Sequence, residues 1–353
     1  MDYELTVEPL GEVVRVKEGQ TILDACLRHG LYLPHACTHG RCSTCKVAVK
    51  DGEVDIGEAT DFALMDFERQ EGKRLACTAT LRTNATIEAD IDEDEDAERN
   101  PVVDLVGTVS RLEDLTPTIK GIWIDLPEDF AFQAGQYVNL YLPGMTRPRA
   151  FSMASPPSQT RTIELHVKRV PGGQGTGYIH DTLAVGDELR MSGPYGQFFV
   201  RWSAEKPIIF VAGGSGMSAI RSMILDMVEE GFEDDVWLFY GAREACELVD
   251  HDLWQRMAEE HDEFHYVPAL SHCPAGSGWQ GCTGFIHEQL AEPFSGRFSG
   301  NTAYLCGPPL MIDATLTTLM QGRLFERDIY TEKFFSERDG DAALSKSPLF
   351  RKI

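Results

Sequence analysis

Four cysteines stand at a spacing that constrains this chain more than any other feature of its sequence. Cys37, Cys42 and Cys45 form a CxxxxCxxC run, and Cys77 follows far downstream. With this spacing four thiolates can enclose a [2Fe-2S] cluster, three from one tight loop and the fourth from a distant segment. A zinc site is the alternative, because Cys42 and Cys45 alone fit half of one. Zinc sites usually pair two CxxC units, however, and the chain has only one. The spacing therefore favours the cluster.

Composition and charge narrow the class of protein. The chain has 353 residues, nine cysteines and a formal net charge of -24, which argues against nucleic-acid binding because phosphates would be repelled. It has no run of about eighteen apolar residues, so we expect no membrane span. The odd number of cysteines and a start without a secretory pattern predict a cytoplasmic protein without disulfides. Cys26 falls on the apolar face of a predicted helix, and we expect it in a core.

An acidic stretch divides the chain. Residues 88–98 read EADIDEDEDAE, and Pro101 follows. Because like charges repel and proline interrupts regular structure, we expect an extended linker here. The predicted division is a first domain over residues 1–92, the linker over 93–102, and two further domains over 103–203 and 204–353.

Each predicted domain has its own pattern. The first contains short β-like runs and a helical stretch over 21–29 that Gly30 can end, which predicts an α+β domain. The second holds short β-like runs punctuated by Gly and Pro, typical of an antiparallel β-barrel. In the third, apolar strands alternate with helices predicted over 218–230 and 248–260, which indicates an α/β domain with a parallel sheet.

Two segments of the predicted barrel suit a flavin nucleotide. The run Arg149, Ala150, Phe151 and Ser152 offers a guanidinium for phosphate, an aromatic ring for stacking and a hydroxyl for the flavin ring. The glycine-rich run GGQGTG at 172–177 offers backbone N–H groups for a pyrophosphate. Each run alone also fits an ordinary strand or loop. Their order within one domain favours a flavin site.

Two strand ends in the last domain predict a dinucleotide site. One is the turn between an apolar strand and a helix, formed by Gly213, Gly214, Ser215, Gly216 and Met217. Glycine permits close approach there, and the helix N-terminus offers N–H donors to phosphate. Cys306, Gly307 and Pro308 follow another strand, and ligands bind at such carboxyl ends. We expect Cys306 to contact the nicotinamide; the alternative is a core residue at a strand end.

Together these motifs resemble the ferredoxin-NADP reductase superfamily, and in particular the reductase components of multicomponent bacterial phenol and toluene hydroxylases. The resemblance covers essentially the whole chain and includes FQAGQY at 132–137 and SGPYGQFF at 192–199. It implies a β-grasp ferredoxin domain, an FAD-binding barrel and an NAD-binding domain, in that order. Phe151 stands where many relatives have Tyr, so one hydroxyl near the flavin is missing.

The resemblance also implies roles for individual residues. The cluster ligands are Cys37, Cys42, Cys45 and Cys77. The FAD-binding residues are Arg149, Ala150, Phe151, Ser152, His166, Val167, Lys168, Gly173, Gly175 and Thr176. The nicotinamide nucleotide is bound by the turn over 213–217 together with Cys306, Gly307 and Pro308. The residues at the reacting atoms are Ser152, Cys306 and Phe334, the last preferred over Phe335.

The implied function is an NADH-dependent reductase. It moves electrons from NADH through FAD and the [2Fe-2S] cluster to an oxygenase partner, the hydroxylase of a phenol- or toluene-type diiron monooxygenase. The alternatives are the reductase of a Rieske dioxygenase or of an alkane or methane monooxygenase. A redox sensor or electron carrier without turnover is an alternative of another class.

We expect NADH rather than NADPH, because Glu244 and Glu247 accompany the single Arg243 after the second strand of the last domain. The acidic surface predicts docking to a basic patch on the oxygenase.

Overall fold

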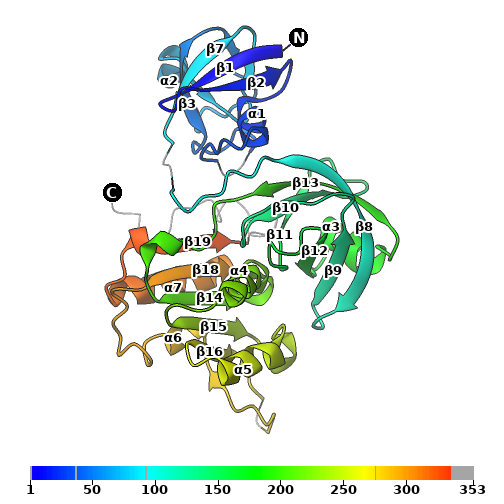
Figure 1. Cartoon of the computed structure of the whole chain (residues 1–353), viewed down its shortest axis with the longest axis vertical. Coiled ribbons are helices and arrows are strands. Elements are labelled where there is room, and N and C mark those ends of the chain that lie inside the picture. The colour runs from blue at the N-terminus through cyan, green and yellow to red at the C-terminus, as the bar shows by residue number, and fades with distance from the viewer. Residues whose placement is uncertain (1, 36–37, 92–93, 275, 335–353) are drawn as a thin grey trace. The chain divides into compact units, whose positions relative to one another are not determined.

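The computed structural model describes residues 2–35, 38–91, 94–274 and 276–334. The chain divides into two compact units, Met1–Val103 and Asp104–Ile353, and each is described here by itself (Figure 1). Among the described residues, no helix is both long enough and apolar enough to cross a membrane.

The first unit is a mixed five-stranded sheet crossed by one helix. The strand order is β2-β1-β7-β3-β5, and only the β1–β7 pair is parallel. This arrangement confirms the predicted α+β domain of the β-grasp type. The elements are β1 (Asp2–Glu8), β2 (Glu12–Lys17), α1 (Ile22–Arg28), β3 (Lys46–Asp51), β4 (Val54–Asp55), α2 (Asp66–Gln70), β5 (Lys73–Leu75), β6 (Thr80–Leu81) and β7 (Ala85–Ala89).

Helix α1 shows how local sequence builds this unit. The Thr21 hydroxyl accepts a hydrogen bond from the Asp24 backbone and caps the helix N-terminus. The helix buries an apolar face that includes Cys26, which is fully buried as expected for a core residue. Gly30 follows with a φ of 72°, a conformation that glycine adopts without steric cost and that ends the helix.

The segment after β7 contains no helix or strand over residues 94–102. Its end belongs to the first unit and is joined to α1, because the Val102 backbone donates to the Leu27 carbonyl at 3.0 Å. Arg99 pairs with Glu12 of β2 at 2.5 Å. The last residues before β8 are therefore held by hydrogen bonds and an ion pair, in addition to any electrostatic extension of the acidic run.

The first part of the second unit is a six-stranded antiparallel barrel. The strand order is β11-β10-β13-β8-β9-β12, and a bridge between Met153 and Leu165 joins the two ends. Its interior is filled by apolar side chains such as Ile122, Val138 and Leu165. The elements are β8 (Val103–Asp114), β9 (Ile119–Asp125), β10 (Tyr137–Tyr141), β11 (Arg149–Ser152), β12 (Thr162–Lys168), α3 (Gln174–Asp181) and β13 (Glu188–Tyr195).

The rest of the second unit is a six-stranded parallel sheet with the order β17-β16-β15-β14-β18-β19. Helices cover both faces, as predicted for an α/β domain. The elements are η1 (Trp202–Ala204), β14 (Ile208–Gly213), η2 (Gly214–Gly216), α4 (Met217–Glu230), β15 (Val236–Ala242), η3 (Ala245–Glu247), α5 (His251–Glu260), β16 (Phe264–Leu270), β17 (Cys282–Thr283), α6 (Ile286–Gln289), β18 (Thr302–Gly307), α7 (Pro309–Gln321), η4 (Glu326–Asp328) and β19 (Ile329–Lys333).

Alternate residues of β14 reach opposite faces of this sheet. Phe210 packs with Ile220 and Ile224 of α4, whereas Val211 packs with Ile312 of α7. Strand β14 therefore consists of apolar residues throughout, because neither face meets solvent.

One predicted helix begins later than expected. The pattern predicts a helix from Leu248, but α5 begins at His251. The backbone of Val249 is already used, since its N–H donates to the Tyr240 hydroxyl and its carbonyl accepts from the Trp254 indole. Side-chain hydrogen bonds to the Val249 backbone are thus found where the first helical turn was predicted.

Candidate cofactor sites

Two predicted cluster ligands lie together at the end of a strand pair. Cys45 directly precedes β3, and Cys77 follows β5, which pairs with it. The Ala76 backbone donates to the Cys45 carbonyl at 2.9 Å, and both cysteines are buried. A hydrogen bond with Cys77 lowers the pKa of Cys45 to about 6, which favours the thiolate that binds iron. In contrast, burial raises the pKa of Cys26 to about 12.

The other two predicted ligands are placed less fully. Cys42 is partly buried, and Cys37 lies outside the described residues. Within the described ranges, no group of three or more His, Cys, Asp or Glu side chains is arranged to hold a metal ion. The loop backbone is nevertheless tightly folded, since a Cβ at Gly40 would overlap the Glu58 carbonyl oxygen. Two adjacent buried thiols beside a close-packed glycine loop fit thiolate ligation of a [2Fe-2S] cluster.

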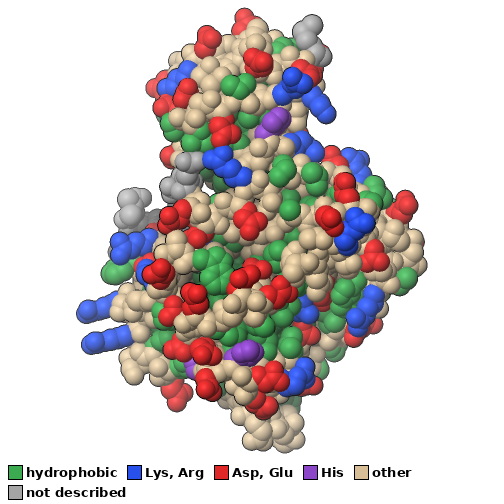
Figure 2. All heavy atoms as spheres, in the orientation of Figure 1, with side chains coloured by type: hydrophobic (Ala, Val, Ile, Leu, Met, Phe, Trp, Pro, Cys, Tyr) green, Lys and Arg blue, Asp and Glu red, His purple; other side chains and the backbone are tan. Residues whose placement is uncertain are grey.

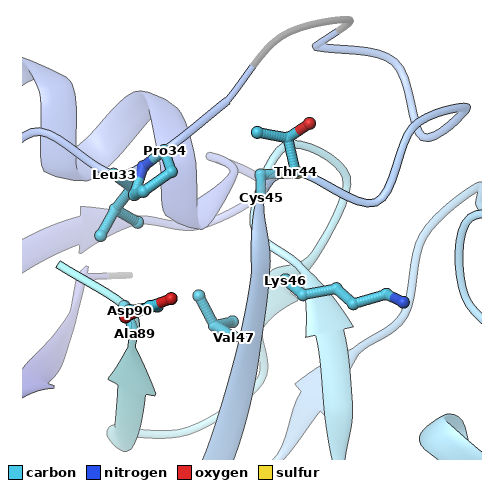
Figure 3. Close-up of a pocket in the computed structure, with 8 residues that line it drawn as sticks. All are labelled: Leu33, Pro34, Thr44, Cys45, Lys46, Val47, Ala89 and Asp90. Atoms are coloured by element: carbon cyan, nitrogen blue, oxygen red, sulfur yellow. The ribbon is translucent and has the colours of Figure 1, made fainter. Parts of the chain in front are cut away.

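A small cavity of about 70 Å³ lies beside Cys45. Figure 3 shows Leu33 and Pro34 from the segment after α1 opposite the start of β3. The cavity is far smaller than the roughly 300–1,000 Å³ of ordinary ligand pockets, so we assign no organic ligand to it. Its lining consists of Leu33, Pro34, Thr44, Cys45, Lys46, Val47, Ala89 and Asp90.

The two predicted flavin segments meet in the barrel. Arg149 and Ser152 bound β11, and Ser152 is buried whereas Ala150 is exposed and Phe151 is partly buried. A Cβ at Gly175 would lie 3.4 Å from Cγ of Arg149. The first turn of α3 therefore packs on the aliphatic part of Arg149, which brings the guanidinium-bearing strand and the glycine-rich segment together.

The start of α3 suits a pyrophosphate. The helix begins after Gly173, and no side chain caps its first N–H groups. Thr176 accepts a hydrogen bond from the Val170 backbone at 3.1 Å, which leaves its own hydroxyl hydrogen to donate. Uncapped N–H groups at a helix N-terminus beside an arginine fit a phosphate group. This part of the barrel therefore fits FAD.

Strand β12 presents alternate residues to two environments. Val167 is fully buried in the barrel core, so only its backbone is available to a ligand. His166 faces the other way, and its Nε2 lies 2.7 Å from Oε1 of Glu164. Its buried Nδ1 has no hydrogen-bond partner among the described residues, as expected where a bound group supplies one.

Lys168, on the same face of β12, reaches the predicted nucleotide turn. Its Nζ lies 3.2 Å from where a Cβ of Gly214 would stand. In the same turn, the hydroxyl of Ser218 donates to the Ser215 carbonyl at 2.8 Å, and the Met217 side chain is fully buried. The barrel thus places a cation beside the turn that is predicted to bind phosphate.

The glycines of the nucleotide turn also bring two strand ends together. A Cβ at Gly216 would overlap the Cys306 carbonyl, and one at Gly213 would lie 3.0 Å from Cδ of Pro308. Gly307 has a φ of 146°, which only glycine adopts readily. The predicted residues of β14 and β18 therefore form one edge of the sheet, where dinucleotides bind in such folds.

A third strand completes the centre of the site. Glu332 of β19 is opposite Cys306 in the parallel register. Its Oε2 accepts from the Ser152 hydroxyl at 3.5 Å and from the Cys306 thiol at 3.9 Å. Phe334 follows, and its backbone donates to the Gly307 carbonyl at 3.0 Å. Of the residues predicted at the reacting atoms, Ser152 and Cys306 therefore meet at Glu332, and Phe334 lies two residues further along the chain beside Gly307.

Burial raises the pKa of both acidic groups in this site, the Glu332 carboxyl and the Cys306 thiol. Desolvation raises the pKa of Glu332 to about 7, although hydrogen bonds from Ser152 and Cys306 act in the opposite direction. Burial also raises the pKa of Cys306 well above its ordinary value, and the nearby Glu332 adds to this effect. Cys306 is therefore a neutral thiol at neutral pH, suited to packing and weak hydrogen bonding rather than to nucleophilic attack.

The motifs did not predict Glu332 as a site residue. It lies in a short strand near the end of the chain, and an isolated carboxylate has no characteristic spacing. Arg221 and Glu164 were missed for the same reason, although Arg221 pairs with Glu164 at 3.1 Å. The only sequence feature near Glu332 is its position two residues before Phe334.

Comparison with known proteins covers all parts of the chain. A model described as a 2Fe-2S iron-sulfur cluster binding domain matches residues 5–82. An oxidoreductase FAD-binding domain matches residues 107–200, and an oxidoreductase NAD-binding domain matches residues 210–317. These matches establish the three cofactor classes and the type of each domain.

Individual relatives extend over the full length. The chain is similar to the reductase component of phenol 2-monooxygenase from Pseudomonas sp. (strain CF600), with 55% identity covering 100% of both chains. It is also similar to the phenol hydroxylase P5 protein of Acinetobacter pittii (strain PHEA-2), with 51% identity covering 100% of both. Among solved structures, an Amycolatopsis cytochrome P-450 reductase superposes with a TM-score of 0.83 and 34% identity, covering 94% of this chain and 98% of that one. The chain therefore belongs to the family of flavo-iron-sulfur oxidoreductases in which a 2Fe-2S domain precedes FAD- and NAD-binding domains, the family of the phenol monooxygenase reductase components.

Proposed function

We propose that this protein is the NADH-dependent reductase component of a phenol-type multicomponent monooxygenase. The observation that carries the proposal is the convergence of Ser152, Glu332 and Cys306, which come from the barrel and from two strands of the parallel sheet. The full-length similarity to the reductase component of a phenol 2-monooxygenase and to a phenol hydroxylase P5 protein supports the choice of partner. The bound cofactors supply the redox chemistry, a two-electron hydride transfer followed by single-electron transfers.

The chain's own residues bind and orient these groups. Arg149 and the start of α3 hold the FAD pyrophosphate. The glycine turn before α4 and Lys168 hold the phosphates of NADH. Ser152, Cys306 and Phe334 line the place where the reacting rings meet, and Glu332 fixes the Ser152 and Cys306 side chains. The four cysteines Cys37, Cys42, Cys45 and Cys77 hold the cluster.

The choice of NADH rests on charge near the end of β15. Glu244 directly precedes η3 and Glu247 is its last residue, and His272 approaches Glu244 at 4.0 Å. A 2′-phosphate would meet these carboxylates as like charges, whereas the NADH ribose hydroxyls would not. NADH is therefore favoured over NADPH.

The acidic surface favours a basic docking region on the oxygenase. Asp and Glu side chains are spread over the visible face of both units (Figure 2), in keeping with the net charge of -24. Opposite charge speeds encounter between partners. We place the protein in the cytoplasm as part of this proposal, because thiolate ligands persist in a reducing compartment.

A two-stage experiment tests the proposal. First, a visible absorption spectrum of the anaerobically purified protein should show flavin and [2Fe-2S] bands, and both should bleach on addition of NADH. Second, the protein should support phenol hydroxylation when mixed with the hydroxylase components of a phenol monooxygenase. Missing flavin or cluster bands would overturn the cofactor assignment. Full bleaching without hydroxylation would leave the reductase intact but refute the phenol-type partner.

A further inference from the structure

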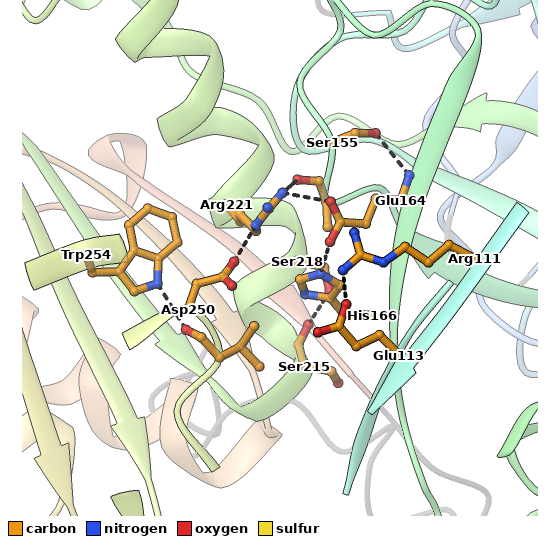
Figure 4. Close-up of polar contacts among 12 residues, drawn as sticks. Arg111, Glu113, Ser155, Glu164, His166, Ser215, Ser218, Arg221, Asp250 and Trp254 are labelled. Atoms are coloured by element: carbon orange, nitrogen blue, oxygen red, sulfur yellow. Dashed lines mark hydrogen bonds and ion pairs between the residues drawn. The ribbon is translucent and has the colours of Figure 1, made fainter. Parts of the chain in front are cut away.

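Arg221 connects the barrel to the nucleotide-binding sheet. It lies on α4, and its side chain is only 15% exposed. Its guanidinium contacts three separate segments (Figure 4). Nη1 donates to the Ala154 carbonyl at 2.7 Å and lies 3.1 Å from Oε2 of Glu164, both in the barrel. Nε donates to Oδ2 of Asp250 at 2.7 Å, directly before α5. We call Arg221, Glu164 and Asp250 the interdomain clamp.

The clamp is held by more than one pair of charges. Burial alone would raise the pKa of Glu164, but the hydrogen bond and charge of His166 and the charge of Arg221 lower it overall. Glu164 is therefore ionised, and so it is a full electrostatic partner of Arg221. Removing the guanidinium would leave the buried Glu164 carboxylate with less compensating charge, since His166 would remain beside it but Arg221 would not, and this is costly in a protein interior.

Neighbouring contacts also join α4 to the segment that follows β11. The hydroxyl of Ser222 donates to the Ser155 carbonyl at 2.7 Å, and both residues are fully buried. Apolar side chains meet beside them, since Phe198 belongs to the same core cluster as Met223. The clamp is thus part of a packed interface between α4 and the barrel.

The clamp is linked directly to the predicted nucleotide site. Helix α4 starts directly after the turn that contains Gly214 and Gly216, so fixing α4 also fixes this turn. On the other side, Glu164 and Lys168 lie on one face of β12, and Lys168 reaches Gly214. A shift of α4 against β12 would therefore move the nucleotide turn relative to the flavin strand.

We propose that Arg221 is a positioning residue: it holds α4 and its nucleotide turn against β12, with Glu164 and Asp250 as anchors, and thereby sets the spacing between nicotinamide and flavin. The inference rests on the proposed reduction of bound FAD by NADH. Arg221 itself touches neither cofactor in this account. Its loss should therefore affect the rate of hydride transfer more than the affinity for NADH.

The test uses Arg221→Gln in the full-length, FAD-loaded protein. We expect the rate of flavin reduction at saturating NADH to fall about tenfold, because a displacement of about 1 Å is enough to disrupt hydride transfer. The NADH concentration for half-maximal rate should change little. Arg221→Lys should restore only part of the rate, since one ammonium cannot bridge three segments. The matched control is Lys206→Gln, which removes an ion pair with Asp328 at 2.7 Å inside the nucleotide-binding domain.

A second readout does not depend on activity. Amide hydrogen exchange should become faster in peptides that cover residues 152–157 and 217–224 of Arg221→Gln, and remain unchanged there in Lys206→Gln. Asp250→Asn, which removes one anchor with little change of shape, should show the same pattern more weakly. This variant keeps the inference testable if Arg221→Gln does not fold.

The outcomes separate the inference from the proposed function. If NADH fails to bleach the wild-type flavin, the proposed function falls. If the wild type is bleached normally and the Arg221 and Asp250 variants keep its reduction rate and exchange pattern, the inference alone is overturned. A rise in the NADH requirement without a change in the maximal rate would also overturn it, because Arg221 would then act in binding rather than in positioning.

Discussion

In the first unit the reactive side chains come from a short stretch of paired backbone, whereas in the second they come from three distant strands. Cys45 and Cys77 lie together because β3 and β5 are neighbours in one small sheet. Ser152, Cys306 and Glu332 meet only because the barrel packs on the parallel sheet and β19 pairs with β18. The predicted cluster ligation therefore depends on one local fold, and the proposed hydride transfer depends on the relative placement of two domains.

This contrast has a physical basis. A cluster is bound by strong bonds to four thiolates, so it can itself organise a loop once the ligands are near. A nicotinamide ring in contact with a flavin is held by packing and hydrogen bonds, which must be positioned in advance. The second unit accordingly contains buried polar contacts between distant segments, such as the Arg221–Glu164 pair. No sequence spacing comparable to that of the cysteines marks these contacts.

The strongest separation of the two regions should come from Cys77→Ser. We expect the variant to lose its [2Fe-2S] absorption and its reduction of cytochrome c, because one of the four predicted thiolate ligands is removed. NADH should still bleach its flavin, since the second unit has its own cores. Spectra and acceptor assays measure both effects. Cys26→Ala, which changes a fully buried core thiol in the same unit, should keep the cluster. Loss of flavin reduction in Cys77→Ser would contradict the view that the second unit binds and reduces its flavin independently of the first.

A smaller effect, confined to the second unit, is expected for Gly216→Ala. The added Cβ would overlap the Cys306 carbonyl, so the two strand ends must move apart at a cost of about 1–3 kcal/mol. Flavin reduction by NADH should fall in stopped-flow assays, while the cluster spectrum stays unchanged.

Gly231→Ala is the control at the other end of α4. Gly231 has a φ of 94° and open space around it, so alanine costs about 1–3 kcal/mol through backbone strain alone. We expect both variants to lose similar stability in thermal melts, and Gly231→Ala to keep normal flavin reduction. This result would assign the loss of reduction in Gly216→Ala to the nucleotide turn. Equal loss of reduction in both variants would contradict that assignment.

The smallest expected effect is a pH dependence at Glu332. Folding raises its pKa from 4.5 to about 7, so between these values the folded state binds more protons than the unfolded state. Stability from this group is therefore fully present below about pH 4.5, falls as pH rises and is lost above pH 7. Glu332→Gln removes this loss. Its stability relative to wild type should rise by about 1–2 kcal/mol between pH 5 and pH 8.

Urea unfolding of both proteins at the two pH values measures this difference. Glu332 is only partly buried as a whole residue, so the expected change is smaller than the full pKa shift would give. A relative stability that does not change with pH would mean that Glu332 keeps an ordinary pKa and that Ser152 and Cys306 do not surround a protonated acid. Burial of Glu332 by packing of distant strands would then have no effect on its protonation.

Helices and strands were predicted correctly where the residues that fix their bounds lie within or next to the element itself. Helix α1 follows from the Thr21 cap, its apolar spacing and Gly30. The apolar run of β14 and the glycine turn after it also follow from sequence, because a buried parallel strand and a tight turn each have a characteristic composition. The start of α5 did not follow, because Tyr240 and Trp254 take the backbone groups of Val249.

The kinds of cofactor could be predicted from the cysteine spacing and the glycine-rich strand ends. These patterns reflect how iron and phosphate are bound, and each spans only a few residues. The carboxylates of the site, in contrast, became apparent only in the folded chain. Glu332 lies between Ser152 and Cys306, and Glu164 pairs with Arg221, because strands far apart in the chain pack against one another. Burial and pairing arise from that packing, so no local pattern of residues reveals them.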